Sequence, residues 1–113
     1  MINVLDFSGD PWTVPQPYLG KRTRQNTTEM RIVWYCLLHT SVYPVQTNDI
    51  YRIIQMTGEQ LSKTRIAVVM RRLCECGYFT RWKPSGWDTS YVYRYAPTSL
   101  FDMVQAEYLE AVA

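Results

Sequence analysis

The segment 61–79 constrains the fold of this 113-residue chain more than any other part of the sequence. Its apolar residues recur at the three- and four-residue spacing of one helix face: Ile66, Met70 and Leu73. The pattern stops at Gly77, and glycine most readily adopts the left-handed backbone that ends many helices. The sequence therefore predicts a helix that begins at Glu59 or Ser62, ends at Cys76 and passes directly into an aromatic strand.

A first amphipathic helix is predicted upstream of this segment. Asn26 and Glu29 have the spacing of a capping box, and Thr27 or Thr28 could provide the cap instead. Apolar residues at helical spacing follow: Met30, Val33, Trp34, Leu37 and Leu38. This stripe predicts that one side of the helix packs against a core.

A short strand at Val45 and a second helix are predicted next. Thr47 is expected to cap this helix, and Asp49 in its first turn is favoured by the helix dipole. The core stripe of the second helix consists of three isoleucines: Ile50, Ile53 and Ile54. Thr57 and Gly58 then form a turn towards the third helix.

Two strands and a last helix complete the predicted elements. Residues 78–83 and 89–95 are rich in aromatic and β-branched residues, and residues 84–88 between them are turn formers. The last helix has apolar residues every four positions, with two more beside them: Leu100, Val104, Tyr108 and Val112, then Phe101 and Met103.

The chain is expected to consist of an N-terminal arm (1–25), a domain (26–97) and a C-terminal amphipathic helix (98–113) that is a candidate for dimerisation. Three prolines in the arm block regular helix, yet the arm is too apolar for a solvated tail. It is therefore expected to lie on its own domain, on a second subunit or on a protein partner. Its basic residues, Lys21, Arg22 and Arg24, fit either a solvated linker or a phosphate contact.

Positive charge is concentrated in the middle of the chain. Residues 21–95 hold all twelve Lys and Arg residues but only five of the ten acids, so this segment carries +7 while the whole chain carries +2. The flanks hold the other five acids and no Lys or Arg. This asymmetry predicts an anionic partner for the middle segment.

The composition is typical of a folded soluble domain, with 47% apolar and 19% charged residues. No apolar run approaches the roughly 18 residues of a membrane span. The N-terminus lacks the basic start of a signal peptide. A cytoplasmic, nucleoid-associated protein without a membrane partner is expected.

The three cysteines lack the spacing of a disulfide framework. Cys36 and His39 could join Cys74 and Cys76 as a zinc ligand set. However, residues two apart on a helix point about 200° away from each other. Buried apolar cysteines and a helix-end histidine are therefore favoured, and neither a metal nor a cofactor is expected.

The side of the third helix opposite Ile66 carries candidate DNA contacts. At about 100° per residue, Thr64, Val68, Arg71 and Glu75 point away from the core. Small and β-branched residues between arginines suit a major groove, where they can meet thymine methyls while the arginines reach guanine edges or phosphates. The predicted DNA contacts on this helix are Ser62, Lys63, Thr64, Arg65, Val68, Arg71 and Arg72. The alternative is that this face packs on a protein surface such as the N-terminal arm.

The predicted hairpin adds more cations. Arg81 and Lys83 share one face of the ribbon, whereas Trp82 lies on the other face and is expected in the core. Arg94 comes from the second strand. Basic residues on such a ribbon often contact phosphates, so Arg81, Lys83 and Arg94 complete the predicted DNA contacts.

Over residues 27–95 the chain resembles the winged helix-turn-helix family. The second helix, the pattern Leu61-Ser-x-x-x-Ile66-x-x-x-Met70-x-x-Leu73-x-x-x-Gly77-Tyr-Phe and the two strands carry the resemblance. It implies a mostly helical α+β fold, with a three-helix core and a two-stranded wing, to which the extended N-terminal arm and the C-terminal helix are added. It also implies base and phosphate contacts from residues 62–72 and a wing at residues 81–94. The turn at 56–60 is longer than the usual tight form, a departure that leaves the start of the recognition helix open.

The leading hypothesis is a small transcriptional regulator that binds specific double-stranded DNA sequences as a homodimer. One alternative is a phage- or plasmid-type replication or recombination accessory protein that uses the same module. Another is a protein–protein interaction module on the same fold. A single histidine, the lack of a phosphate-binding glycine loop and the lack of a nucleophile–base pair argue against an enzyme.

Overall fold

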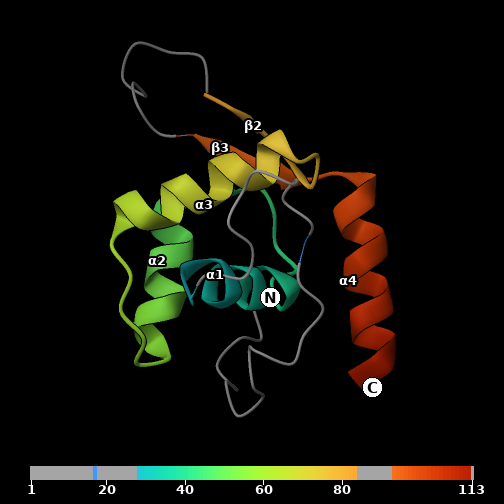
Figure 1. The fold of residues 1–113 in the computed structure, drawn as a ribbon, viewed down its shortest axis with the longest axis horizontal. Helices are drawn as coiled ribbons and strands as arrows, with labels where there is room; N and C mark the ends of the chain where they lie inside the picture. The colour runs from blue at the N-terminus through green and yellow to red at the C-terminus, as the bar shows by residue number, and fades with distance from the viewer. Residues whose placement is uncertain (1–16, 18–27, 84–92, 113) are drawn as a thin grey trace.

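The computed structural model describes residue 17, residues 28–83 and residues 93–112, and Figure 1 shows their arrangement. These ranges form a mostly helical α+β fold with four helices and a three-stranded antiparallel sheet. The elements in chain order are α1 (Thr28–Leu38), β1 (Val45–Gln46), α2 (Thr47–Met56), α3 (Lys63–Glu75), β2 (Phe79–Trp82), β3 (Arg94–Pro97) and α4 (Ser99–Val112). None of the helices in these ranges is long and apolar enough to cross a membrane. The predicted arm, apart from the buried Pro17, lies outside the described residues, as do Lys21, Arg22, Arg24 and the turn at 84–88.

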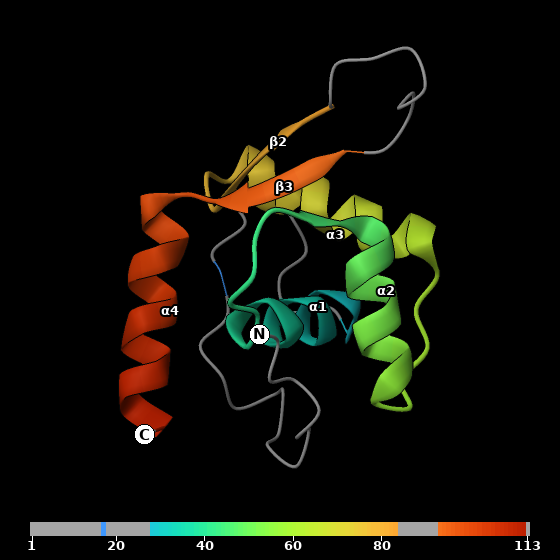
Figure 2. The same ribbon diagram turned by 180° about the vertical axis from the view of Figure 1, so that it is seen from behind.

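α1 is the central element of the fold. Figures 1 and 2 show α2 and α4 on either side of it, with α3 and the sheet across one end of this layer. The predicted stripe of α1 is buried, and Ile32, Tyr35 and Cys36, which do not belong to that stripe, are buried as well. A helix becomes buried nearly all round when neighbouring elements cover it on several sides.

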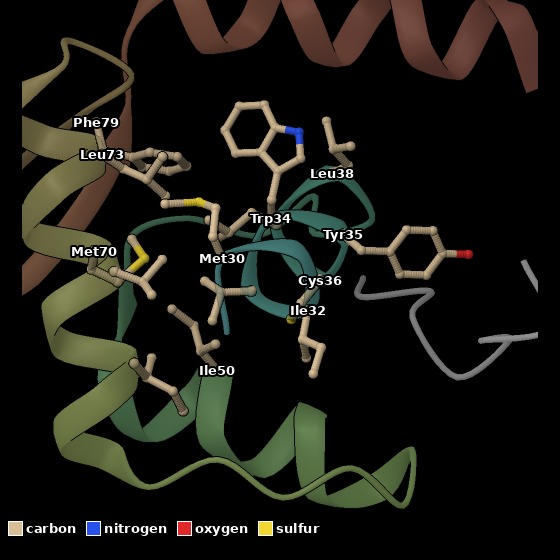
Figure 3. Close-up of a cluster of buried hydrophobic side chains, with 14 of the residues drawn as sticks. Met30, Ile32, Trp34, Tyr35, Cys36, Leu38, Ile50, Met70, Leu73 and Phe79 are labelled. Atoms are coloured by element: carbon tan, nitrogen blue, oxygen red, sulfur yellow. The ribbon is translucent and has the colours of Figure 1, made fainter. Parts of the chain in front are cut away.

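Trp34 joins the layers of this core. Its side chain is fully buried and makes T-shaped ring contacts with Tyr78 and Phe101. The distance between ring centroids is 5.3 Å to Tyr78 and 5.2 Å to Phe101. Figure 3 shows Trp34 pointing from α1 towards α4, while Met30 points towards α3. Phe79 and Phe101 continue the aromatic cluster at 4.6 Å. Pairs of this kind add roughly 0.5–1.5 kcal/mol beyond the burial of their area.

The sheet has the strand order β1-β3-β2. β3 is therefore the central strand, and its Tyr95 is paired with residues of both neighbours. The N–H of Thr98 donates to the carbonyl of Tyr78 at 3.0 Å, so the pairing continues past the last residue of β3. As a result β3 ends later than the predicted end at residue 95, while the predicted residues 89–92 lie outside the described part of the chain.

The start of α2 differs from the prediction. Gln46, not Thr47, is the N-cap residue, and the carboxylate of Asp49 accepts a hydrogen bond from the N–H of Gln46 at 2.8 Å. Gln46 and Asp49 together form a capping box. Thr47 is the first helical residue because this box sets the boundary one position earlier.

Both ends of α3 follow from its sequence. Of the two predicted starts, the structure selects Ser62, whose Oγ accepts a hydrogen bond from the N–H of Arg65 at 3.2 Å. At the other end Gly77 has a φ of +88°, and the N–H of Tyr78 donates to the carbonyl of Leu73 at 2.9 Å. This Schellman-type ending turns the chain directly into β2.

α4 packs through a stripe that is shifted from the predicted one. Phe101 and Tyr108 are buried and Val104 is half-buried, whereas Leu100 and Met103 are exposed. Of the stripe predicted as a candidate for dimerisation, Tyr108 and Val104 therefore pack within the chain, whereas Leu100 stays on the surface. The larger Phe101 fills the space beside Trp34 and turns its neighbour Leu100 outward, because adjacent helical residues point about 100° apart.

Polar contacts also hold α4 against the end of α1. The side-chain amide of Gln105 donates to the carbonyls of Leu38 at 3.0 Å and Thr40 at 2.9 Å. The His39 Nε2 and the Tyr108 hydroxyl are 2.8 Å apart. The bonds from Gln105 satisfy carbonyls at a helix end, which have no partner within the helix. α4 thus shares one core with α1.

Replacing Phe101 by Ala is expected to lower the free energy of unfolding by about 3–5 kcal/mol, because the change opens a cavity beside Trp34. The matched control is Met103→Ala, at a position of the same helix that is 55% exposed, which should change this free energy by less than about 0.5 kcal/mol. Urea unfolding followed by tryptophan fluorescence measures both effects. Two equally small effects would contradict the placement of α4 in the cooperative core.

Candidate nucleic-acid interface

The outward face of α3 is exposed, as predicted. The inward side chains are buried in the core: Ile66, Val69, Met70 and Leu73. Four residues on the opposite side are exposed: Thr64, Val68, Arg71 and Glu75. Val68 is 44% exposed. A single exposed valine is ordinary on a protein surface, so the character of this face depends on the charged side chains around Val68.

The two flanks of this exposed face differ in their surroundings. At about 100° per residue, Arg65 and Arg72 lie on one flank, while Lys63 and Ala67 lie on the other. Ala67 and Lys63 border a hollow on the side of the sheet. Cations therefore border the face on both sides.

Two cations, Arg81 in β2 and Lys83 just after it, lie on the same side of the sheet as α3. Arg81 and Lys83 alternate with Trp82 and share a sheet face with the buried Phe79, which packs in the core. The guanidinium carbon of Arg81 is 4.4 Å from the ring centroid of Tyr93, and the Nζ of Lys83 is 5.0 Å from it. Cations over an aromatic face are held by its quadrupole, so Tyr93 orients both side chains.

Arg94 and Trp82 do not follow the predictions made for them. The register places Arg94 directly opposite Trp82, on the sheet face away from Arg81 and Lys83. Trp82 is 43% exposed, so the prediction that it lies in the core is wrong, because Phe79 fills the core position of β2. Arg94 is half-buried, and its Nε is enclosed without a hydrogen-bond partner. The structure therefore separates Arg94 from the other predicted contacts.

A hollow of about 390 Å³ lies where the start of α2, the start of α3 and β3 meet. Its lining includes Asn48, Lys63, Thr64, Tyr93 and Tyr95. Burial raises the pKa of Tyr95 above its ordinary value, at which the hydroxyl is already protonated at neutral pH. The hollow thus combines a cation, hydroxyl groups and the first turn of a helix, all of which can interact with an anion.

A second hollow of about 360 Å³ lies on the other side of the start of α3 and is bordered by Tyr51, Gln55 and Ser62. The Nζ of Lys63 is 5.1 Å from the ring centroid of Tyr51. Lys63 therefore borders one hollow and contacts a residue of the other. Neither Tyr51 nor Tyr93 is among the predicted contacts, because an aromatic residue at a helix or strand position is usually part of the core.

Arg65 is already engaged within the chain. Its Nη1 donates to the Oε1 of Glu29 at 2.6 Å, which links the first turn of α3 to the first turn of α1. The sequence suggested only a capping role for Glu29, since the two residues are 36 positions apart. Arg65, one of the predicted contacts on α3, is thus engaged by a carboxylate of α1.

The elements segregate charge. α3 contains four bases and one acid: Lys63, Arg65, Arg71 and Arg72, against Glu75. α4 contains three acids and no base: Asp102, Glu107 and Glu110. The basic surface of α3 and β2 and the acidic surface of α4 therefore belong to different elements, and the sheet connects them.

The cysteines and His39 do not come together. Cys36 is fully buried, and burial raises the pKa of its thiol to about 12, whereas Cys74 and Cys76 are only half-buried. His39 contacts Tyr108 of α4 instead. Within residues 28–83 and 93–112, no group of three or more His, Cys, Asp or Glu side chains is arranged to hold a metal ion. All three cysteines are free thiols.

Comparison of the chain with protein-family models, with curated proteins and with solved structures gave no significant match. The geometry of the described residues is therefore the basis for the functional interpretation. Among the predicted contacts, Lys63 and Thr64 line the hollow beside Tyr93, and Arg81 and Lys83 lie over the Tyr93 ring. Val68, Arg71 and Arg72 are exposed further along α3. Ser62 caps α3, Arg65 is paired with Glu29, and Arg94 lies on the far face of the sheet.

Replacing Ser62 by Ala is expected to lower the free energy of unfolding by about 1 kcal/mol, because the N–H of Arg65 loses its acceptor. Ser62→Asn is the matched control, since an asparagine side chain can accept the same bond and should retain most of this free energy. Thermal unfolding measured by circular dichroism reports both changes. A loss as large in the asparagine variant as in the alanine variant would contradict the capping role.

Proposed function

We propose that this protein is a small transcriptional regulator that binds specific double-stranded DNA sequences. In this proposal the fold functions as a winged helix-turn-helix, with α1, α2 and α3 as the helical core and the β2–β3 ribbon as the wing. α3 enters the major groove and the ribbon contacts the backbone. The observation that carries the proposal is the exposed face of α3, which is small and β-branched at its centre and lies between basic side chains.

The dimensions of α3 suit a major groove. Its 13 residues span about 20 Å, and a major groove about 12 Å wide admits one helix. Thr64 and Val68, one turn apart, present methyl groups that can contact thymine. Arg71 follows on the same face and can donate two hydrogen bonds to the edge of a guanine. These three side chains are the proposed base contacts.

Phosphate contacts are proposed for the cations around this face. Arg72 borders the exposed face of α3, and Lys63 lies beside both hollows at its start. Arg81 and Lys83, oriented by Tyr93, extend the basic surface along β2. A backbone phosphate in the hollow near the start of α2 would also gain from the helix dipole. Arg94 is not included in this contact set, because it lies on the other sheet face.

Charge segregation supports one orientation on DNA. A helix with three acids and no base is repelled by phosphates, whereas a surface with several cations is attracted. DNA therefore approaches α3 and β2 and avoids α4. This leaves α4 available for the homodimer that we propose, in which the exposed Leu100 and Met103 form part of the subunit contact. Such a dimer would read two half-sites about 34 Å apart.

Trp82 supports a second candidate function, a protein–protein interaction module. It is exposed on the sheet face away from α3, and tryptophan is enriched where proteins meet. In this case the Trp82 face, together with the N-terminal arm, would bind a protein partner and α3 would not need DNA. Binding that survives nuclease treatment and is lost in Trp82→Ala would favour this function over the first.

DNA binding can be tested with duplexes of random sequence and a duplex selected from them. If a dimer neutralises six phosphates, the logarithm of the affinity should fall with the logarithm of the salt concentration with a slope of about −5. Arg71→Ala should weaken binding to the selected duplex by about 1–3 kcal/mol, because a base contact is lost. Fluorescence anisotropy across salt concentrations measures both quantities.

The matched control is Arg52→Ala, which removes an equal charge from an exposed position of α2 outside the proposed contact set. It should weaken binding much less than Arg71→Ala. An equal loss in both variants would contradict base reading by Arg71. No binding to any duplex at 50 mM salt would refute the proposed function.

A further inference from the structure

The ion pair between Glu29 and Arg65 lies at the edge of the proposed DNA-binding surface. The Arg65 Nη1 donates a short, charge-assisted hydrogen bond to the Glu29 Oε1 at 2.6 Å. Arg65 is on the α3 flank that it shares with Arg72, about 100° from the buried Ile66. From this flank an arginine reaches the DNA backbone more easily than a base.

This ion pair contributes little to folding stability. The Arg65 side chain is 65% exposed and that of Glu29 is 30% exposed. Ion pairs in contact with solvent typically add little to the free energy of unfolding, because water screens the attraction and two side chains lose rotational freedom. The main consequence of the pair is therefore electrostatic, since it neutralises a positive charge on one flank of α3.

We propose that Glu29 is a specificity-determining residue that weakens sequence-independent DNA binding. This inference rests on the proposed function. The Glu29 carboxylate accepts a hydrogen bond from Nη1 and offsets the positive charge of the Arg65 guanidinium, so a phosphate beside Arg65 meets an ion pair in place of a full cation. Binding to random DNA depends almost entirely on phosphate contacts, whereas base contacts from Thr64, Val68 and Arg71 do not involve Arg65. Glu29 thus weakens the part of the binding affinity that comes from phosphate contacts, which is the same for every DNA sequence.

The decisive variant is Glu29→Gln, which keeps the shape of the side chain but removes its charge. One additional neutralised phosphate should steepen the salt slope by about 0.9 and raise the affinity for a random duplex about eightfold at 0.1 M salt. Fluorescence anisotropy with a random-sequence duplex at several salt concentrations measures both values. Circular dichroism establishes that the variant is folded.

Two controls separate the proposed mechanism from a general charge effect. Glu107→Gln on α4 makes the same change in net charge away from α3 and should alter the affinity less than about twofold, because salt screens distant charges. In an Arg65→Gln background, Glu29→Gln should have no further effect, because Glu29 acts through Arg65.

The possible outcomes distinguish this inference from the proposed function. Equal affinities of Glu29→Gln and Glu107→Gln, in a protein that does bind DNA, would overturn the role of Glu29 alone. A gain that persists in the Arg65→Gln background would also overturn it, because Glu29 would then repel phosphates directly. Failure of the unmodified protein to bind any duplex would refute the proposed function and this inference with it.

Discussion

The burial of Trp34 on the central helix is the contact on which the rest of the structure depends. Trp34 lies in α1, and its ring meets Tyr78 at the entry to β2 and Phe101 at the start of α4. One side chain therefore sets the position of the sheet and of the last helix relative to α1. Since α1 also packs on α2 and α3, a single core fixes the relative positions of all four helices.

Packing in this core determines which side chains stay on the surface, where they can contact another molecule. α3 places Ile66, Val69, Met70 and Leu73 inward, so its small and basic residues face outward. Gly77 ends the helix and directs the chain into β2, which brings Arg81 and Lys83 beside the same surface. Tyr93 then orients these two cations through its ring face. The basic surface is thus a consequence of how the core is filled and of the sharp turn that follows α3.

Electrostatics adds a second level of organisation. The acids of α4 lie in a different element from the cations near α3 and β2. A polyanion is therefore attracted to the basic elements and repelled by α4. Glu29 acts locally against this trend, because it pairs with an arginine of the basic surface. The proposed DNA affinity is therefore a balance between exposed cations and the carboxylate of Glu29.

The sequence by itself determined the helices, the end of α3 at Gly77 and the outward face with Thr64, Val68 and Arg71, because these depend on local periodicity and local backbone preferences. Only the tertiary structure decided that Phe101 rather than Leu100 enters the core, that Arg94 lies with Trp82 on the far sheet face, and that Arg65 is paired with Glu29. These features depend on strand register and on contacts between residues far apart in the chain. Residue spacing shows which side chains share one face of a helix or strand, but it does not show which other element packs against that face.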